Sequence, residues 1–479
     1  MAQKPLTQKE IETEIQRIMD GEGCESDPFE DSGNNDLLIP QPSANANQAN
    51  LFENSSTATQ QPLEETSNND IGEQGLSTNA GQSNLSQHCP SPKSNDSERN
   101  MENNLFLPRY IIKPKTKYLK GKNGHKWSAE MPERCGKTKA RNIIHFLPGP
   151  KADVTNCSTY DEYFLHLFSN EMLDIILLHR NAEITRQAEK YKSNANVFQT
   201  TKIEIKALLA ILIKSAAHKD NHLLTKYMFD TKISGTFYRA CMSGEHFSFL
   251  INCLRFDDKG TKLERKKADS FAPIREIWDI FIAKYRNSYI PSSYLTIDEQ
   301  LIGFRGRCPF RMYIPSKPCK YAIKIIMVCD SSSKYMLDAS PYLGKSTKTN
   351  GLPLATYFVK ELTKSVHGSN RNITMDNWFT SVGLANDLLK DPYKLTIIGT
   401  LRKNKREIPK KMLNVRERNP NTSMFCHDQM KTMVLYVPKK NKIVLLLSTL
   451  HEGAEISSIG KPAIIMNYDE TKGGIDTFD

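Results

Sequence analysis

Three aspartates that lie far apart in the chain occupy positions where carboxylates can do chemistry. Asp298 lies at the centre of the apolar run SYLTIDEQLIGF, Asp376 ends the run RNITMD, and Asp476 belongs to the closing KGGIDTFD, with Asp479 three residues later. A carboxylate in a central strand is costly to bury unless it is paired or coordinates a cation. Carboxylates on neighbouring strands and a following helix form the oxygen-rich site that Mg²⁺ or Mn²⁺ prefers.

Phosphoryl transfer on nucleic acid is the chemistry that needs such a set. Two divalent ions about 3.5–4 Å apart activate the attacking water or hydroxyl and stabilise the leaving 3′-oxygen. We therefore predict a catalytic metal site at Asp298, Asp376 and Asp476. Asp476 and Asp479 are expected on one face of a helix, because residues three apart are neighbours there.

A structural interpretation of these carboxylates stays open beside the catalytic one. Asp298, followed directly by Glu299, could be a strand-edge acid that pairs with one of the arginines after it. The other two aspartates could each cap a helix. Five basic residues that follow Asp298 are predicted to contact DNA phosphates and to position the DNA without reading bases: Arg305, Arg307, Arg311, Lys317 and Lys320.

The segments around the first two aspartates have the pattern of an α/β layer. KYAIKIIMVCD and KYMLDASPYLG are two further strand candidates, and KLTIIGTLRKN is another. DNWFTSVGLANDLLK indicates a turn into a helix capped by Thr380 or Ser381. Three successive strands and a strand–helix–strand crossover predict an α/β fold. Residues 403–461 fit this pattern poorly, with strand-like pieces at 432–438 and 442–450, and are predicted to be an insertion.

Upstream of Pro291 the apolar residues recur every three or four positions, which is typical of helices. We expect an all-helical domain at 147–292, with Ser158 or Thr159 capping its first helix and Ser243 a later one. It precedes an α/β domain at 293–402 that resumes at 462–479 after the insertion.

The charge of the chain is strongly asymmetric. The net charge is +11 overall, yet residues 1–100 contain 5 Lys and Arg against 17 Asp and Glu. Residues 1–104 are acidic and poor in aromatic residues, so we predict that they are disordered, apart from a possible short helix at 7–19. Residues 105–146 are a basic linker that either contacts phosphates or is simply solvated. A basic body favours a polyanion partner, although a merely soluble basic surface stays open.

Cysteine spacing and apolar runs exclude several classes of protein. No two of the ten cysteines stand two to four residues apart, which excludes a CxxC zinc module and a dense disulfide framework. No apolar run has the length of a membrane span, and the N-terminus lacks the pattern of a signal peptide. We expect an intracellular protein with reduced thiols, no membrane partner and no small-molecule substrate.

Seven stretches of the chain stand out as long motifs. They are TIDEQLIGFRGRCPFRMYIPSKPCKY, ITMDNWFTS, TIIGTLRKNKREIP and TKGGIDTFD, and upstream AAHKDNHLLT, LINCLRFDDK and FAPIREIWDIFI. They resemble, nearly word for word, the signature motifs of the piggyBac transposase family, and the resemblance covers roughly residues 140–479.

This resemblance implies a fold, an activity and partners. It implies an RNase H-like catalytic domain interrupted by an insertion domain, and a helical region for DNA binding and dimerisation. The activity would be metal-dependent nicking of transposon ends in double-stranded DNA, hairpin formation, and joining to TTAA targets, by a nuclear homodimer. The family's catalytic and metal-binding aspartates fall on Asp298, Asp376, Asp476 and Asp479.

Members of the family continue into further helices and a cysteine-rich tail, so the resemblance implies a C-terminal truncation at Asp479 and leaves open whether the chain is an active enzyme. The alternative is a transposase-derived DNA-binding or chromatin-associated protein without catalysis. A structure-specific nuclease on the same fold is a third hypothesis.

Overall fold

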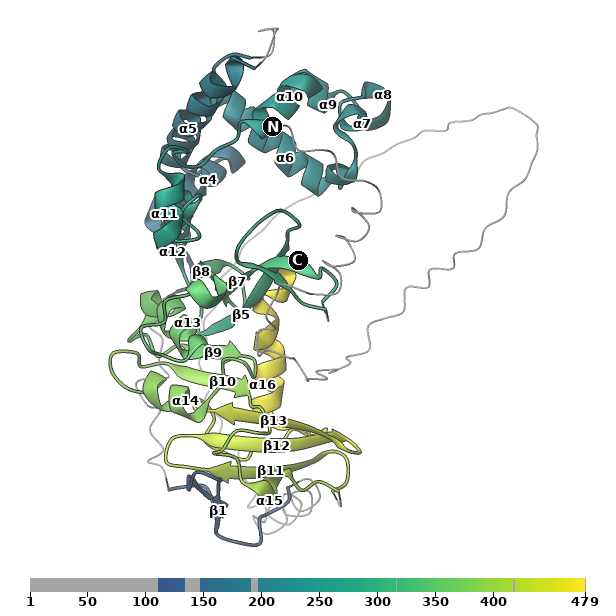
Figure 1. Ribbon diagram of the computed structural model, residues 1–479. Helices are drawn as coiled ribbons and strands as arrows, with labels where there is room; N and C mark the ends of the chain where they lie inside the picture. Colours follow the sequence, from purple (N-terminus) through teal and green to yellow (C-terminus); the bar gives the residue numbers. More distant parts are fainter. Residues whose placement is uncertain (1–110, 134–146, 191–196, 316, 417, 479) are drawn as a thin grey trace, which may run out of the picture. The chain divides into compact units, whose positions relative to one another are not determined.

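The computed structural model describes residues 111–133, 147–190, 197–315, 317–416 and 418–478 (Figure 1). The predictions for residues 1–104, for much of the linker and for Asp479 lie outside these ranges. Within them, no helix combines the length and the apolar character that a membrane crossing requires.

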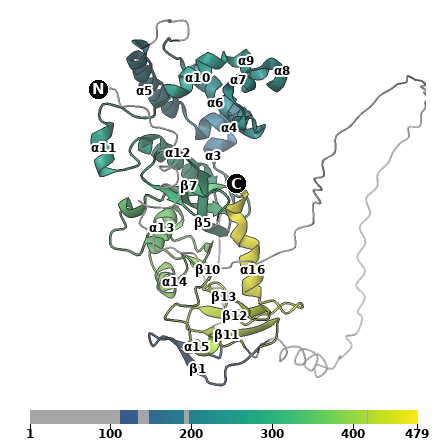
Figure 2. The ribbon, with the colours of Figure 1, turned by 45° about the vertical axis from the view of Figure 1, so that its right-hand side comes forward.

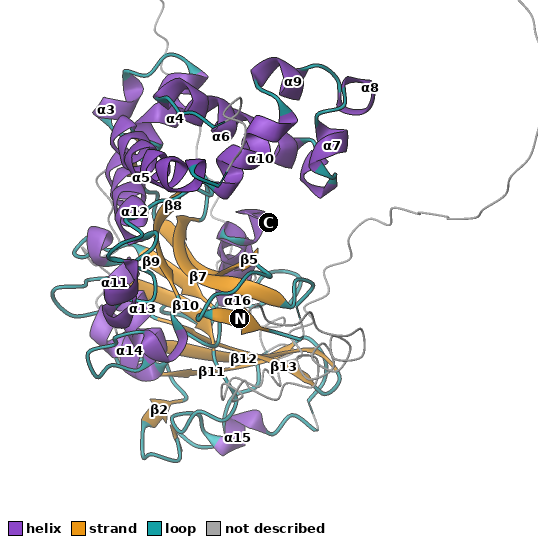
Figure 3. Ribbon diagram, turned by 45° about the horizontal axis from the view of Figure 1, so that its top comes forward, coloured by secondary structure: helices purple, strands orange, loops and turns teal. Residues whose placement is uncertain are grey.

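A mixed sheet of eleven strands is the framework of the described α/β region (Figure 3). Its order is β1-β2-β11-β12-β13-β10-β9-β5-β7-β6, and β8 also pairs with β7. Five of these strands cover the predicted strand segments, and those predictions are confirmed. They are β5 (Tyr294–Gly303), β7 (Tyr321–Asp330), β8 (Met336–Pro341), β9 (Asn372–Met375) and β10 (Thr396–Thr400).

Strand β5 lies inside the sheet, between β7 and β9. It runs antiparallel to β7, which is antiparallel to β8, and it runs parallel to β9, which is parallel to β10. Asp298 on β5 is therefore not a strand-edge acid, which corrects the structural interpretation of that residue.

Helices cover both faces of this sheet, because successive residues of a strand point to opposite faces. Ile397 packs in the cluster of α13 (Leu354–Leu362) and α14 (Val382–Leu388), whereas Ile398 packs against α16 (Ala463–Thr471). Figure 2 shows α16 on the opposite side of the strands from α13 and α14. Helix α12 (Arg275–Ser288) packs on β7 and β8 through Ile282, on the same face as α16.

Helix α14 begins where the sequence predicts its N-terminal cap. The Ser381 hydroxyl accepts a hydrogen bond from the Leu384 N–H at 3.1 Å, so Ser381 rather than Thr380 is the cap. Helix α13 has no counterpart among the predicted elements.

The segment predicted as an insertion extends the same sheet. Strands β11 (Thr422–His427), β12 (Thr432–Lys439) and β13 (Lys442–Ser448) form an antiparallel meander, and β13 pairs with β10. Strands β12 and β13 match the two predicted strand pieces, and the short helix α15 (Lys410–Leu413) precedes them.

Part of the basic linker also belongs to the sheet. Strands β1 (Tyr118–Lys120) and β2 (Lys126–Ser128) form a hairpin that pairs with β11 through Ser128 and His427. Residues 118–128 are therefore not a solvated linker. Three shorter strands complete the described set: β6 (Arg311–Tyr313) pairs with β7, and β3 (Gly149–Pro150) pairs with β4 (Tyr289–Ile290).

The region predicted to be helical contains helices from Ala152 to Ser288. The Ser243 hydroxyl accepts from the His246 N–H at 3.1 Å and caps α10, as predicted. The apolar run that begins at Tyr160 is broken at Phe168, and a second helix begins after Ser169, which occupies its N-cap position. The helices before α12 are α3 (Ala152–Thr155), α4 (Tyr160–Leu167), α5 (Asn170–Ala188), α6 (Lys202–Ala217), α7 (Thr225–Met228), α8 (Thr231–Ser234), α9 (Phe237–Cys241), α10 (Gly244–Asn252) and α11 (Lys262–Ala268).

Candidate active site

Asp298 and Asp376 are brought together by the register of two parallel strands. Ile297 of β5 is paired with Met375, the last residue of β9. Asp298, on β5, and Asp376, which directly follows β9, are the next residues, so they lie at the same level of neighbouring strands, although they are 78 positions apart in the chain.

The environment of both carboxylates favours their neutral forms. Burial raises the pKa of Asp298 well above its usual range, and the negative charges of Glu299 and Asp376 raise it further. Burial, together with the charge of Glu299, raises the pKa of Asp376 to about 6. This shift persists although the Trp378 and Phe379 N–H groups donate to Asp376 Oδ1 at 2.9 and 3.4 Å and favour its charged form.

Glu299 and Lys324 belong to the same site, and the sequence interpretation assigned no catalytic role to either. Lys324 Nζ lies 4.0 Å from Glu299 Oε2, and both side chains are largely buried, at 15% and 21% exposure. The ammonium also lies 4.9 Å from the centroid of the Trp378 ring, where cation–π attraction stabilises it. The lysine charge lowers the pKa of Asp376, against the effect of burial. The sequence does contain a clue to both residues, because each is a charged residue inside an apolar, strand-like run.

Asp376 caps a turn, but it does not cap helix α14. The two hydrogen bonds that it accepts come from the N–H groups two and three positions after it, whereas Ser381 caps the helix. The structural interpretation predicts that Asp376 caps a helix. Asp376 does accept capping hydrogen bonds, but they belong to a turn and not to helix α14.

Asp476 does not lie on the helix that the sequence predicted for it. Helix α16 ends at Thr471, and Asp476 begins a 3₁₀ turn, Asp476–Phe478, in which it is exposed. The two glycines between them explain the break. Gly473 has a ψ of 22°, outside helical values, and a Cβ at Gly474 would lie 2.6 Å from Thr296 Oγ1, so only glycine fits this approach to β5.

A buried set of hydroxyls fixes the end of α16 to strands β5 and β9. Thr296 Oγ1 donates to the Thr471 carbonyl at 2.5 Å, and it accepts from the Ser331 hydroxyl at 2.9 Å. The Thr471 hydroxyl donates to the Asn467 carbonyl at 2.7 Å, so it accepts from Thr374 Oγ1, also at 2.7 Å. These contacts set where the chain leaves α16 toward Asp476.

Tyr468 of α16 also faces the carboxylates. Burial raises its pKa, and the charges of Asp376 and Asp298 raise it further, which places the phenol within electrostatic reach of both. A neutral phenol beside two acids remains a hydrogen-bond donor at all physiological pH values.

Asp298 and Asp376 supply two of the oxygen donors that a divalent cation needs. Within the described ranges, no group of three or more His, Cys, Asp or Glu side chains is arranged to hold a metal ion. Asp298 and Asp376 are nevertheless hard oxygen donors whose mutual repulsion a cation would relieve. The predicted fourth acid, Asp479, lies outside the described residues.

The predicted DNA-contacting residues all lie on the surface, near the end of β5 and the start of β7. Arg305, Arg307, Lys317 and Lys320 are exposed. Arg311 is exposed too, but its Nη1 donates to the carbonyls of Arg305 and Gly306 at 2.9 and 3.1 Å, so it also shapes the loop. Arg305 follows Asp298 by seven residues, which at about 3.3 Å per residue is an extended distance of about 23 Å.

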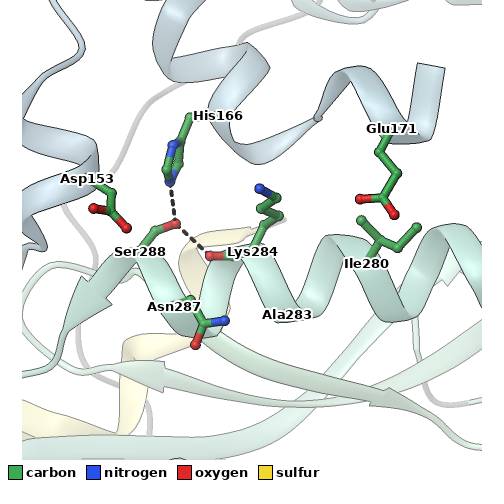
Figure 4. A pocket seen from close by; sticks show the side chains of 8 residues that line it. All are labelled: Asp153, His166, Glu171, Ile280, Ala283, Lys284, Asn287 and Ser288. Atoms are coloured by element: carbon green, nitrogen blue, oxygen red, sulfur yellow. Dashed lines mark hydrogen bonds between the residues drawn. The ribbon is translucent and has the colours of Figure 1, made fainter. Parts of the chain in front are cut away.

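A polar pocket between α3, α4, α5 and α12 is a separate feature (Figure 4). His166 Nε2 and Ser288 Oγ lie 2.9 Å apart, which resembles a catalytic pair. The Ser288 hydroxyl, however, donates its hydrogen to the Lys284 carbonyl at 2.6 Å. His166 must therefore donate to Ser288, and a base that activates the serine is not formed.

Comparison with known proteins gives matches over most of the chain. The family model described as Transposase IS4 matches residues 160–479. The cryo-EM structure of a piggyBac transposase synaptic complex with hairpin DNA is 50% identical in sequence, and its TM-score is 0.68. The match covers 70% of this chain and 70% of that chain. The chain is similar to that transposase in both sequence and fold.

Proposed function

Because this chain belongs to the piggyBac transposase family, we propose that it cleaves the ends of a transposon and joins the exposed 3′-hydroxyls to TTAA targets. The observation that carries this proposal is the placement of Asp298 and Asp376 at the same level of neighbouring parallel strands. Two partly buried acids side by side supply oxygen donors of the kind that hold the divalent cations of metal-dependent phosphoryl transfer.

Transposases of the DDE superfamily generally use divalent metal ions. We propose that Asp298 and Asp376 hold Mg²⁺ or Mn²⁺ together with Asp476 and Asp479. When bound, the ions supply Lewis-acid activation of the attacking oxygen and stabilise charge on the leaving oxygen.

The protein's own side chains hold the site in place. We assign β5, β7, β8, β9 and β10 to an RNase H-like catalytic domain, in which the strands keep the two carboxylates in register. Lys324 offsets the charge of Glu299 beside them. The buried threonines that fix the end of α16 would position Asp476 relative to the two strand aspartates.

The proposed partner is double-stranded DNA, bound by a nuclear homodimer. The exposed basic residues Arg305, Arg307, Lys317 and Lys320 would contact phosphates of the bound strand. Contacts of this kind would position the DNA and leave the chemistry to the carboxylates.

Metal-dependent cleavage by the purified chain tests this function. Wild-type protein is incubated with candidate terminal-repeat DNA and Mg²⁺ or Mn²⁺, and the nicked strands are separated by electrophoresis. Asp376→Asn keeps the acceptor for Trp378 but removes a charge that a metal ion needs, so we expect its cleavage to fall to background. Asp387→Asn is the control, because Asp387, on α14, pairs with Lys360 of α13 at 2.7 Å. Equal cleavage by wild type and Asp376→Asn would defeat the proposal.

DNA binding without catalysis is the competing function. The exposed position of Asp476, in a 3₁₀ turn beyond the end of α16, favours it. This alternative predicts salt-sensitive DNA binding by a protein that does not cleave DNA with either metal.

A further inference from the structure

The β1–β2 hairpin is anchored firmly to the sheet and to the loop that follows β10. Trp127 is fully buried, and its indole N–H donates to the Glu407 carbonyl at 2.9 Å. A Cβ at Gly121 would lie 2.5 Å from the same carbonyl oxygen, so the turn of the hairpin sits directly on this loop. The hairpin and residues 402–411 therefore form one structural unit.

This unit is connected to the candidate active site. Arg402 Nε donates to Asn377 Oδ1 at 3.1 Å, and Asn377 directly follows Asp376. Further along the same loop, the Arg406 carbonyl accepts from the Asn123 N–H of the hairpin at 3.3 Å. A continuous path of contacts thus runs from the site to the hairpin.

Two lysines on the outer face of the hairpin repel each other. Leu119 and Trp127 face inward and are buried, whereas Lys120 and Lys126 are exposed and lie directly opposite each other. Like charges at directly opposed positions of an antiparallel pair are destabilising. Lys122, in the turn, is exposed as well.

Neighbouring basic residues form ion pairs with carboxylates, whereas the lysines on the hairpin form none with the residues that the structure describes. Nearby residues are paired, as Lys117 is with Glu130 at 3.6 Å and His125 with Asp428 at 3.3 Å. In the described ranges, no ion pair involves any member of what we call the basic hairpin surface, which consists of Lys120, Lys122, Lys126, Lys403 and Arg406. All five are exposed.

We propose that the basic hairpin surface binds the phosphate backbone of double-stranded DNA, at a contact separate from the cluster that begins at Arg305. The proposal deepens the proposed function and rests on it for the choice of duplex DNA as the partner. A polyanion removes the repulsion between Lys120 and Lys126, because its phosphates supply the missing negative charges. Such contacts carry no base recognition, so the surface binds duplexes with and without TTAA equally.

The salt dependence of binding by the full chain tests this surface. Each Lys–phosphate contact contributes about 0.9 to the slope of log K against log [salt] on duplex DNA. We expect the triple variant Lys120→Gln, Lys122→Gln and Lys126→Gln to lower that slope by about 2 to 3, with the same decrease on duplexes that contain or lack TTAA.

A matched triple variant controls for net charge. Lys364, Lys390 and Lys394 are also exposed, and two of them have carboxylate partners, so their replacement by Gln should leave the slope nearly unchanged. Thermal melting checks that both triple variants are folded, and Lys122→Gln alone, in the exposed turn, should lower the slope by about 1.

The outcomes separate this proposal from the proposed function. Equal slopes for the hairpin variants and the control would overturn the DNA contact, even if the chain cleaves DNA. A decrease in the salt slope that is confined to the hairpin variants supports the DNA contact, even if the metal-dependent cleavage test fails. A decrease on TTAA duplexes alone would overturn the assignment to backbone phosphates.

Discussion

The hydroxyls of Thr374 and Thr471 lie 2.7 Å apart, although the two residues are separated by 97 positions in the chain. Both side chains are buried. Thr374 belongs to the strand that ends before Asp376, and Thr471 ends the helix that precedes Asp476. This hydrogen bond therefore couples the elements that carry two of the proposed catalytic acids.

Replacing Thr374 by Val should destabilise the protein and impair cleavage. The substitution keeps the shape but removes the donor to Thr471, which costs about 1–2 kcal/mol of unfolding free energy. We expect cleavage to fall further than this loss of stability accounts for, because the chain leading to Asp476 shifts. Urea unfolding and cleavage rates measure the two effects. Thr185→Val, on the exposed side of α5, should change neither, and equal effects of both variants would contradict this role.

Replacing Asp376 by Asn should stabilise the metal-free protein at neutral pH. The folded pKa of about 6 lies above the usual value of 3.8, so the fold favours the protonated acid. The stability that this preference provides is complete below about pH 4 and is lost as the pH rises through about 6. A shift of about two pKa units corresponds to roughly 3 kcal/mol at most.

Urea unfolding in EDTA at several pH values measures this effect. The advantage of Asp376→Asn over wild type should grow between about pH 4 and pH 7 and then level off. An advantage that is independent of pH would show that the acid is not perturbed in the fold.

Mg²⁺ or Mn²⁺ should raise the melting temperature of the wild-type protein. A ligand at ten times its dissociation constant stabilises the fold by about 1.4 kcal/mol. Asp298→Asn and Asp376→Asn remove proposed ligands and should abolish most of the shift, whereas Asp387→Asn should keep it. Shifts of the same size in all four proteins would place the cation elsewhere.

Replacing Lys324 by Met should move the pH dependence of cleavage. Lys324 lowers the pKa of Asp376, so its loss raises that pKa and keeps the acid protonated to higher pH. The acidic limb of the rate–pH profile should therefore shift to higher pH. Lys324→Arg preserves the charge beside Glu299 and should leave the limb in place. Overlapping profiles for the wild-type and Lys324→Met enzymes would argue against this electrostatic role.

Replacing Gly121 by Ala should loosen the β1–β2 hairpin without unfolding the sheet. The new Cβ would meet the Glu407 carbonyl oxygen at 2.5 Å, and such overpacking costs about 1–3 kcal/mol. Limited proteolysis should then cut between residues 111 and 133 faster than in wild type. A Cβ at Gly383 would meet nothing within 4 Å. Gly383→Ala is therefore the control, and it should leave the rate and the sites of proteolysis unchanged.

The local elements and the family can be predicted from the amino-acid sequence alone. The sequence predicts strands β5, β7, β8, β9 and β10, because runs of β-branched and aromatic residues bounded by turn residues favour strands through short stretches of sequence alone. The same holds for the Ser381 cap, which needs only residues three positions away. The resemblance to the piggyBac family depends on whole motifs, and the comparisons confirm it.

Which of these residues come into contact depends on how the strands and helices pair in the folded protein. The pairing of β5 with β9 makes Asp298 and Asp376 neighbours, and the cross-strand position of Lys324 brings it to Glu299. The sequence pattern predicts a linker at 105–146 and does not show its β1–β2 hairpin, because the strand with which this hairpin pairs, β11, lies in a distant part of the chain. Helix α16 ends before Asp476 because Gly474 must approach Thr296 on a distant strand. Each of these outcomes depends on contacts between residues far apart in the chain, which local propensity and spacing do not encode.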